Sequence, residues 1–464
     1  MASKKKEKKA INGDDDYSPE IIQQMTGKKG KDTIQQPEEQ KEEVPIPQST
    51  EVLASKEEKK EEPIQQAATA EEDEVDEDGY IVSKKVYANP SPAETQAEQA
   101  RESPLDLKNK FLIFIGAQFC FFDLATENWD IGDVFLKERS DVKDIVSNQN
   151  ESYYMPDNSS VIQLHSNLNW ADRIPAIVTG GQYGGKISAE AFGLSFIQSS
   201  VNGMKVLEAY VEQRFPDLPA PRFLHRTAGV KIGGRTHLLV LGGKSSVHDK
   251  QALKSVLKLD IHGLISKEFS KQKEKVKWTE CAPMQESRSL FASTVIDDKF
   301  VYVYGGISKT EGDFKPSLAK NMIERFDVNT NKWSSFVVEG APSLSAFGWT
   351  EGQFSHELFI LGGTDGFSMQ TSLFKLDLKE EKCINLNVEF DSLTALGKLS
   401  AFKNSKTGYY KIYSFGGSNS EGAGYSVDFN TETPQWKLLD KSYLPLFSGI
   451  EDRDLLFKQS VYFQ

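Results

Sequence analysis

The fold of this protein is decided by Val303-Tyr-Gly305-Gly306 and by the run that follows it, Met322-Ile-Glu-Arg-Phe-Asp327, Asn329-Thr-Asn331 and Trp333. Short runs of β-branched and aromatic residues bounded by Gly, Asn and Asp are typical of β-strands. A glycine pair at a strand end allows positive φ angles and close backbone approach. The Asp-x-Asn-Thr-Asn run is typical of a turn. The stretch therefore predicts two strands, a tight turn and a buried tryptophan.

This pattern recurs along the chain, with first glycines 54 to 64 residues apart. The glycine pairs are Gly180-Gly181, Gly242-Gly243, Gly305-Gly306, Gly362-Gly363 and Gly416-Gly417, with a degenerate sixth copy at Phe111 to Gly116. Tryptophans follow the second run at Trp129, Trp278, Trp333 and Trp436. One such unit cannot bury both of its faces, so the units must stack into a closed ring. The repeat predicts an all-β propeller with six four-stranded blades, and five or seven blades are the alternatives.

The repeat resembles the kelch motif, which is an apolar strand ending in Gly-Gly, a loop, a strand ending near Asp, and a Trp after a polar turn. The resemblance covers residues 108–464 and is most specific at 283–334 and 408–437. The copies are longer than the ~50 residues typical of a kelch unit. The resemblance therefore implies a kelch-type propeller with long loops.

The composition divides the chain into two parts, 1–105 and 106–464. Residues 1–105 carry 10 of the 13 net negative charges and contain none of the 28 Phe and 6 Trp residues. A segment so charged and so poor in apolar residues cannot bury a core, so we expect a disordered acidic tail. We expect the propeller to occupy residues 106–464. Its first copy lacks an inner strand, and the apolar run at 454–463 is predicted to supply that strand and to close the ring.

The acidic balance argues against nucleic acid as a partner, because duplex binders need concentrated positive charge. No segment reaches the ~20 apolar residues of a membrane span. The three cysteines and six histidines show no metal-ligand spacing, so we predict neither a metal nor a cofactor. The sparse cysteines favour a cytoplasmic location, and a cytoskeletal or ciliary assembly is an alternative setting.

Family resemblance implies a non-catalytic scaffold or adaptor that binds proteins through the loops of one propeller face. Kelch-like rings commonly hold acidic or extended peptides there with arginines at the start of inner strands, and Arg222 and Arg288 match that position. In the fifth copy the matching residue is predicted to be Ser343. The full predicted face comprises Arg222, His225, Lys244, Arg288, Ser343, Thr364 and Ser418. Arginine suits carboxylates because its planar fork makes paired hydrogen bonds. The structural alternative is that these arginines cap or bridge blades.

Two further alternatives stay open at this point. Some kelch-like propellers are enzymes, although this sequence shows no catalytic motif. In the tail, the acidic run at 71–78 leads into the alternating apolar run at 79–87. We call residues 71–87 the island. It is a solvated spacer, an added strand for a partner, or a segment that screens the chain's own arginine face.

Overall fold

The computed structural model describes the propeller region with gaps and two short strands upstream of it. The described residues are 74–75, 81–82, 103–115, 118–138, 155–163, 174–183, 185–201, 204–262, 264, 276–311, 315–319, 322–352, 356–390, 398–403, 407–416, 424–439 and 459–463. Most of the tail that is predicted to be disordered therefore lies outside the described residues, as do Gly417 and Ser418. The two upstream strands, β1 (Glu74–Val75) and β2 (Ile81–Val82), pair antiparallel within the predicted island.

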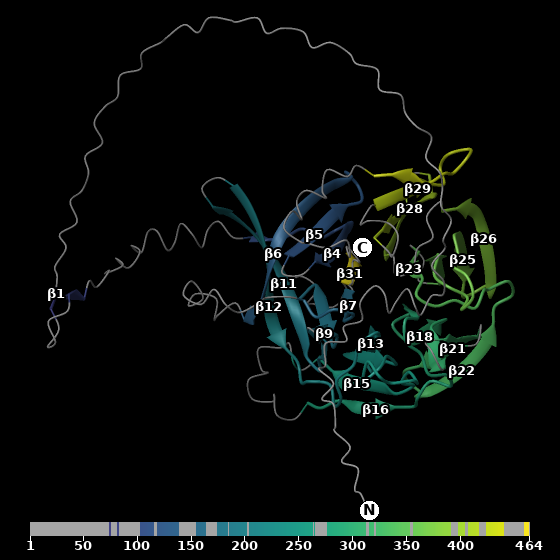
Figure 1. Cartoon of the computed structure of the whole chain (residues 1–464), viewed down its shortest axis with the longest axis horizontal. Coiled ribbons are helices and arrows are strands. Elements are labelled where there is room, and N and C mark those ends of the chain that lie inside the picture. The colour runs from purple at the N-terminus through teal and green to yellow at the C-terminus, as the bar shows by residue number, and fades with distance from the viewer. Residues whose placement is uncertain are drawn as a thin grey trace, which may run out of the picture. The chain divides into compact units, whose positions relative to one another are not determined.

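Six four-stranded antiparallel blades surround an axis (Figure 1), which confirms the predicted six-bladed all-β fold. Blade 3 comprises β13 (Arg226–Ile232), β14 (Arg235–Leu241), β15 (Val256–Asp260) and β16 (Thr279–Cys281). Blade 4 comprises β17 (Ala292–Ile296), β18 (Phe300–Tyr304), β21 (Met322–Asp327) and β22 (Lys332–Val337). Blade 5 comprises β23 (Gly348–Glu351), β24 (Glu357–Leu361), β25 (Ser372–Asp377) and β26 (Lys382–Glu389). Blade 6 comprises β27 (Lys398–Lys403), β28 (Tyr410–Phe415), β29 (Gly424–Asp428) and β30 (Lys437–Leu438).

Blades 1 and 2 share one sheet, which the repeat did not predict. Blade 1 comprises β31 (Gln459–Phe463), β4 (Lys110–Ile115), β5 (Gln118–Asp123) and β6 (Asn128–Glu138). Blade 2 comprises β7 (Ser160–Gln163), β8 (Ala176–Thr179), β11 (Ala191–Val201) and β12 (Met204–Arg214). The outer strands β6 and β12 pair in parallel, and β3 (Ser103–Pro104) pairs with β11. β3 thus lies just before the predicted boundary at 106 and pairs with a strand of blade 2.

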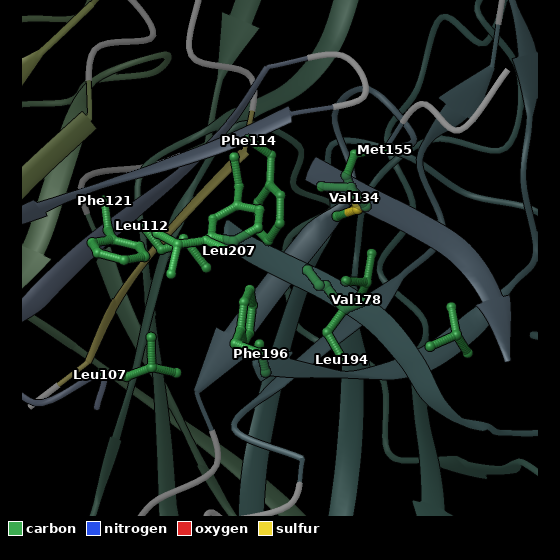
Figure 2. Packing of buried hydrophobic residues seen from close by; sticks show 14 of the residues in the cluster. Leu107, Leu112, Phe114, Phe121, Val134, Met155, Val178, Leu194, Phe196 and Leu207 are labelled. Atoms are coloured by element: carbon green, nitrogen blue, oxygen red, sulfur yellow. The ribbon is translucent and has the colours of Figure 1, made fainter. Parts of the chain in front are cut away.

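Packing between blades 1 and 2 forms a phenylalanine-rich core (Figure 2). Phe114, Phe121 and Phe196 are buried there together with Leu112 and Leu207 from facing strands. Burying a side chain of this size contributes roughly 1.5–3 kcal/mol, so this cluster is a major source of stability. The length of β11 and β12 follows from it, because both strands continue along the side of blade 1.

The last strand of the chain lies next to the first long strand of the propeller. β31 pairs antiparallel with β4 over five residue pairs, from Gln459 opposite Phe114 to Phe463 opposite Lys110. Residues 454–458 of the predicted closing run lie outside the described residues. Inner strands of adjacent blades lie against one another, as β7 does against both β31 and β13. No helix that could cross a membrane occurs in the part of the chain that the structure describes.

The four repeat tryptophans join neighbouring blades. Trp333 donates from Nε1 to the Ala282 carbonyl at 2.8 Å, and Ala282 follows the outer strand of the preceding blade. The other pairs across blade boundaries are Trp278 with the Pro216 carbonyl, Trp436 with Phe390, and Trp129 with Phe415. The last pair links blade 1 to blade 6. Large rings therefore fill the spaces between adjacent blades, where they bury the most apolar surface.

The glycine pairs connect each blade to the next through the backbone. The second glycine, as in Gly243 and Gly306, has a positive φ and donates its N–H to a carbonyl of the following blade at 2.8 Å. A Cβ on Gly243 would lie 2.6 Å from the Phe223 oxygen and 2.7 Å from the His225 Cβ. Only glycine fits here, because both its φ and its neighbours exclude a side chain.

We expect Gly243→Ala to lower the free energy of unfolding by about 2–4 kcal/mol, because left-handed strain and overpacking add. Gly234 is the matched control, since its φ is also positive but no atom lies within 4 Å of the place where a Cβ would stand. Gly234→Ala should cost only about 1–2 kcal/mol of strain. Urea unfolding of both variants measures the difference. Equal losses would mean that close approach plays no part.

Candidate partner-binding site

A short lead-in segment precedes the inner strand of several blades and contains a left-handed residue. Leu224, Leu290 and Ala346 have φ angles of 55°, 54° and 54°. The N–H of Leu290 donates to the Leu224 carbonyl at 3.3 Å, and the N–H of Ala346 donates to the Leu290 carbonyl at 3.4 Å. Such φ values are uncommon outside glycine and mark positions that the surrounding fold holds in place. The lead-in segments thus form a chain of hydrogen bonds from blade to blade.

We call this end of the propeller the glycine face. It comprises the lead-in segments 222–225, 288–291 and 344–347 and the loops that follow the glycine pairs. Two of those loops are joined. The blade 4 loop contains a hairpin of β19 (Ile307–Glu311) and β20 (Lys315–Leu318). The blade 3 loop is hydrogen-bonded to this hairpin, because the backbone N–H of Ala252 donates to the Ser308 carbonyl and that of Thr310 donates to the Lys250 carbonyl. The blade 2 loop carries a smaller ladder of β9 (Gln182–Tyr183) and β10 (Lys186–Ile187). Within the described residues, these loops are therefore held by backbone hydrogen bonds.

Arg288 lies inside blade 4 and does not reach the surface. Its side chain and that of Glu324 are both 0% exposed, and they form an ion pair with Nη2 2.9 Å from Oε1. Arg288 also donates to the carbonyls of Gly305 and Met322. Glu324 accepts the N–H of Gln285 as well. Arg288 and Glu324 thus bond to each other and to backbone groups next to them. These contacts support the bridging role for Arg288 that the sequence left open.

Arg222 occupies the same position in blade 3 but forms no ion pair with an acidic residue that the structure describes. Leu257 stands where blade 4 has Glu324, because Val240 pairs with Leu257 as Val303 pairs with Glu324. Arg222 donates to the Gly242 carbonyl at 3.2 Å, and its buried Nε has no hydrogen-bond partner. Burial lowers the pKa of Arg222 to about 10, so the group stays charged at neutral pH.

Arg226 begins the inner strand β13 and crosses toward blade 5. Its Nε donates to the Phe291 carbonyl at 2.6 Å, and its guanidinium carbon lies 5.6 Å from the centre of the Trp349 ring. The residues that begin the inner strands of blades 4 and 5 are small, Ala292 and Gly348, which leaves room for the long side chain. Burial lowers the pKa of Arg226 to about 10. The charge therefore persists beside an aromatic ring.

His225 and Lys244 complete the surroundings of these arginines. His225 is fully buried, with Nε2 2.8 Å from the Thr179 hydroxyl. Burial, followed by the charges of Arg222 and Arg226, holds its pKa well below the usual value, so the imidazole is neutral. The backbone of Lys244 forms a β-bridge with that of Phe223, and burial lowers the pKa of the Lys244 side chain. Among the described residues, Arg222, Arg226 and Lys244 form no ion pair, and we call these three the basic centre.

The remaining predicted face residues fall in different places. The equivalent of Arg222 and Arg288 in blade 5 is Leu344, not Ser343, because Gly306 donates to the Leu344 carbonyl as Gly243 does to that of Arg288. The prediction was one residue off because the lead-in segments differ in length after the proline. Thr364 is buried at the base of the blade 5 loop. Ser418 lies outside the described residues.

Arg226 and Trp349 were missed by sequence reasoning. The only available signal was a basic residue directly after Leu224-His225, and nothing in the sequence places Trp349 next to it. Among the residues that the structure describes, no cluster of three or more His, Cys, Asp or Glu side chains is arranged to hold a metal ion. The basic centre is suited to binding negative charge, because its three members are cations that form no ion pair among the described residues.

Comparison with known proteins gives partial similarities to kelch-repeat proteins. No family model matches the sequence. Kelch domain-containing protein 3 of Bos taurus is 28% identical over 162 residues, which span 32% of this chain and 38% of that protein. Kelch-like protein 40 of Xenopus tropicalis is 35% identical over 98 residues, which span 21% of this chain and 12% of that protein. The matched segments thus span well under two thirds of the length of either relative. Together with the glycine-pair repeat and the six blades, these similarities are consistent with a kelch-repeat β-propeller.

Proposed function

We propose that this propeller is a non-catalytic interaction scaffold that binds an acidic segment of a partner protein at the glycine face. Kelch-repeat propellers generally bind other proteins. The observation that carries the finer proposal is the basic centre, in which three cations share one blade and form no ion pair among the described residues, although Asp249 acts on Lys244 through space. A buried charge is costly unless it is paired. A carboxylate from a partner would supply the missing pair.

Within the basic centre, Arg226 is the residue that we expect to meet the partner. It is half-buried, whereas Arg222 and Lys244 are 3% and 4% exposed. Trp349 holds its guanidinium plane through a cation–π contact. A guanidinium that is already ordered loses less entropy on binding and can donate two parallel hydrogen bonds to a carboxylate. Arg222 and Lys244 then add long-range attraction from behind.

We expect Arg226→Gln to weaken the binding of an acidic peptide by about tenfold, or 1.4 kcal/mol. The probe is a fluorescein-labelled peptide with the sequence of residues 71–78, Glu-Glu-Asp-Glu-Val-Asp-Glu-Asp, titrated with the full-length chain and followed by fluorescence anisotropy. The matched control variant is Lys205→Gln, because Lys205 is exposed and pairs with Asp130 on the outer strands.

The control peptide replaces each Glu by Gln and each Asp by Asn. Binding of the acidic peptide should also fall as salt rises, since exposed charges are screened. Equal binding of the two peptides, or an Arg226→Gln variant that binds as well as the wild-type chain, would contradict the proposal.

A further inference from the structure

Arg222 and Arg288 are held in the same way in two neighbouring blades. Arg222 donates from Nη1 to the carbonyl of Gly242, the first glycine of the blade 3 pair, at 3.2 Å. Arg288 donates from Nη1 to the carbonyl of Gly305, the first glycine of the blade 4 pair, at 2.7 Å. Both side chains are buried, with Arg222 3% and Arg288 0% exposed. The neighbours of the two guanidinium groups can therefore be compared one by one.

The two sites differ at the position that the Nε atom of the arginine meets. In blade 4, the Nε of Arg288 donates to Oε1 of Glu324 at 3.0 Å. In blade 3 the matching position is Leu257, and the buried Nε of Arg222 has no hydrogen-bond partner. The Nη2 of Arg222 donates to the hydroxyl of Ser255, two residues before Leu257, at 3.4 Å. Blade 3 thus keeps the guanidinium but has no carboxylate at the position that neutralises it in blade 4.

A buried guanidinium without a counter-charge is strongly unfavourable. Burial lowers the pKa of Arg222 to about 10, so the group is still charged at neutral pH. Such a charge is costly unless it is paired and hydrogen-bonded. Burial, followed by the charge of Arg222, lowers the pKa of His225, and the Nδ1 of His225 is a second buried atom without a hydrogen-bond partner. A negative charge beside Arg222 would offset its cost.

The chemistry of the blade 3 site favours a negative group of one atom. A leucine side chain ends one bond before the place that the carboxylate oxygens of a glutamate reach, so Leu257 does not extend as far as Glu324. In blade 4, Glu324 also accepts the backbone N–H of Gln285. Counted back from the arginine, the matching residue in blade 3 is Pro219, which has no N–H. A carboxylate or a phosphate would therefore lack a donor that holds Glu324, whereas a spherical ion needs fewer donors.

We propose that blade 3 binds a halide ion, such as chloride, at the Nε of Arg222, in the place that the Glu324 carboxylate takes in blade 4. The ion accepts the Nε–H and neutralises the guanidinium. A carboxylate of a partner protein does not reach this atom, because Arg222 is 3% exposed. The halide removes only the long-range attraction that Arg222 adds, and Arg226 stays available to a partner. The inference is therefore independent of the proposed function.

Thermal melts of the full-length chain, followed by circular dichroism, test for the ion. The buffer contains sodium chloride or sodium gluconate at the same ionic strength, because gluconate is too large for a site of one atom. An ion that binds only the folded chain raises Tm, and we expect Tm to be about 3 °C higher in chloride. Arg222→Met removes the charge, so its Tm should be the same in both salts. Lys205→Met, at an exposed ion pair, is the matched control and should keep the full shift.

Leu257→Glu tests the same site in the opposite way. It places a carboxylate where blade 4 has Glu324, so the Nε of Arg222 gains a partner within the chain. The variant should then melt at the same temperature in chloride and in gluconate. If Leu257→Glu does not fold, the comparison of Arg222→Met with Lys205→Met still decides.

A crystal of the wild-type chain grown in sodium bromide locates the ion directly. The expected anomalous difference peak lies next to the Nε of Arg222, and the lack of a peak there would overturn the proposal. Equal melting temperatures of the wild-type chain in the two salts would also overturn it. An Arg222→Met chain that keeps the full chloride shift would do the same, because the ion would then bind elsewhere.

Discussion

Arg288→Ala is expected to lower the free energy of unfolding by about 3–5 kcal/mol, because it leaves the buried Glu324 carboxylate without its counter-charge. Both side chains are 0% exposed, so water cannot replace the lost partner. For a propeller of this size the loss corresponds to a fall in Tm of roughly 5 °C. Urea unfolding and a thermal melt followed by circular dichroism measure both quantities. Such a loss is a large share of the 5–15 kcal/mol that stabilises a typical domain.

The control for this prediction is an exposed ion pair. Lys205 and Asp130 are 44% and 43% exposed, and Lys205→Ala should cost at most about 1 kcal/mol. The double variant Arg288→Ala with Glu324→Ala should be less destabilised than the two single changes summed, because neither charge is then left alone. Additive losses would show that the two charges act independently. In that case the ion pair is not what holds blade 4.

Ending the chain at residue 458 is expected to abolish the cooperatively folded monomer. The truncation removes β31, which pairs with β4 over five residue pairs. At ~1 kcal/mol for each ladder hydrogen bond, the loss approaches the whole stability of the domain. It also exposes the backbone groups of β4 as an open edge, which promotes aggregation. Soluble yield, size-exclusion chromatography and thermal melting measure the outcome.

Side-chain contacts between blades 1 and 6 remain in the truncated chain and provide the internal comparison. Phe111 stacks on Phe415 with ring centres 4.9 Å apart, and Tyr413 hydrogen-bonds to Glu127 at 3.0 Å. If these contacts closed the ring by themselves, the truncated chain would keep its Tm. Adding a synthetic peptide of residues 454–464 should restore folded protein if β31 is the missing part.

Local signals were enough to predict most of the strand order. The run Met322 to Asp327 is β21, and Trp333 lies on β22 directly after the predicted turn. Glycine pairs and Asp-Asn turns specify these elements because their backbone requirements are met by neighbouring residues alone. The pairing of β6 with β12 was missed because it joins residues about 75 positions apart, and no local pattern marks it. The left-handed conformation of Leu224 was missed because leucine rarely adopts it.

The sequence by itself determined the kind of repeating unit, because a glycine pair, a polar turn and a tryptophan act within one blade, and it favoured six copies over five or seven. It also pointed to arginines at the start of the inner strands. Only the tertiary structure decided what those arginines do. Arg222 and Arg288 follow the same motif, yet Arg288 pairs with Glu324, whereas blade 3 has Leu257 at the position that Glu324 occupies in blade 4. The charge that surrounds a side chain is set by residues that the sheet brings together from more than 30 positions away, and a local motif does not contain them.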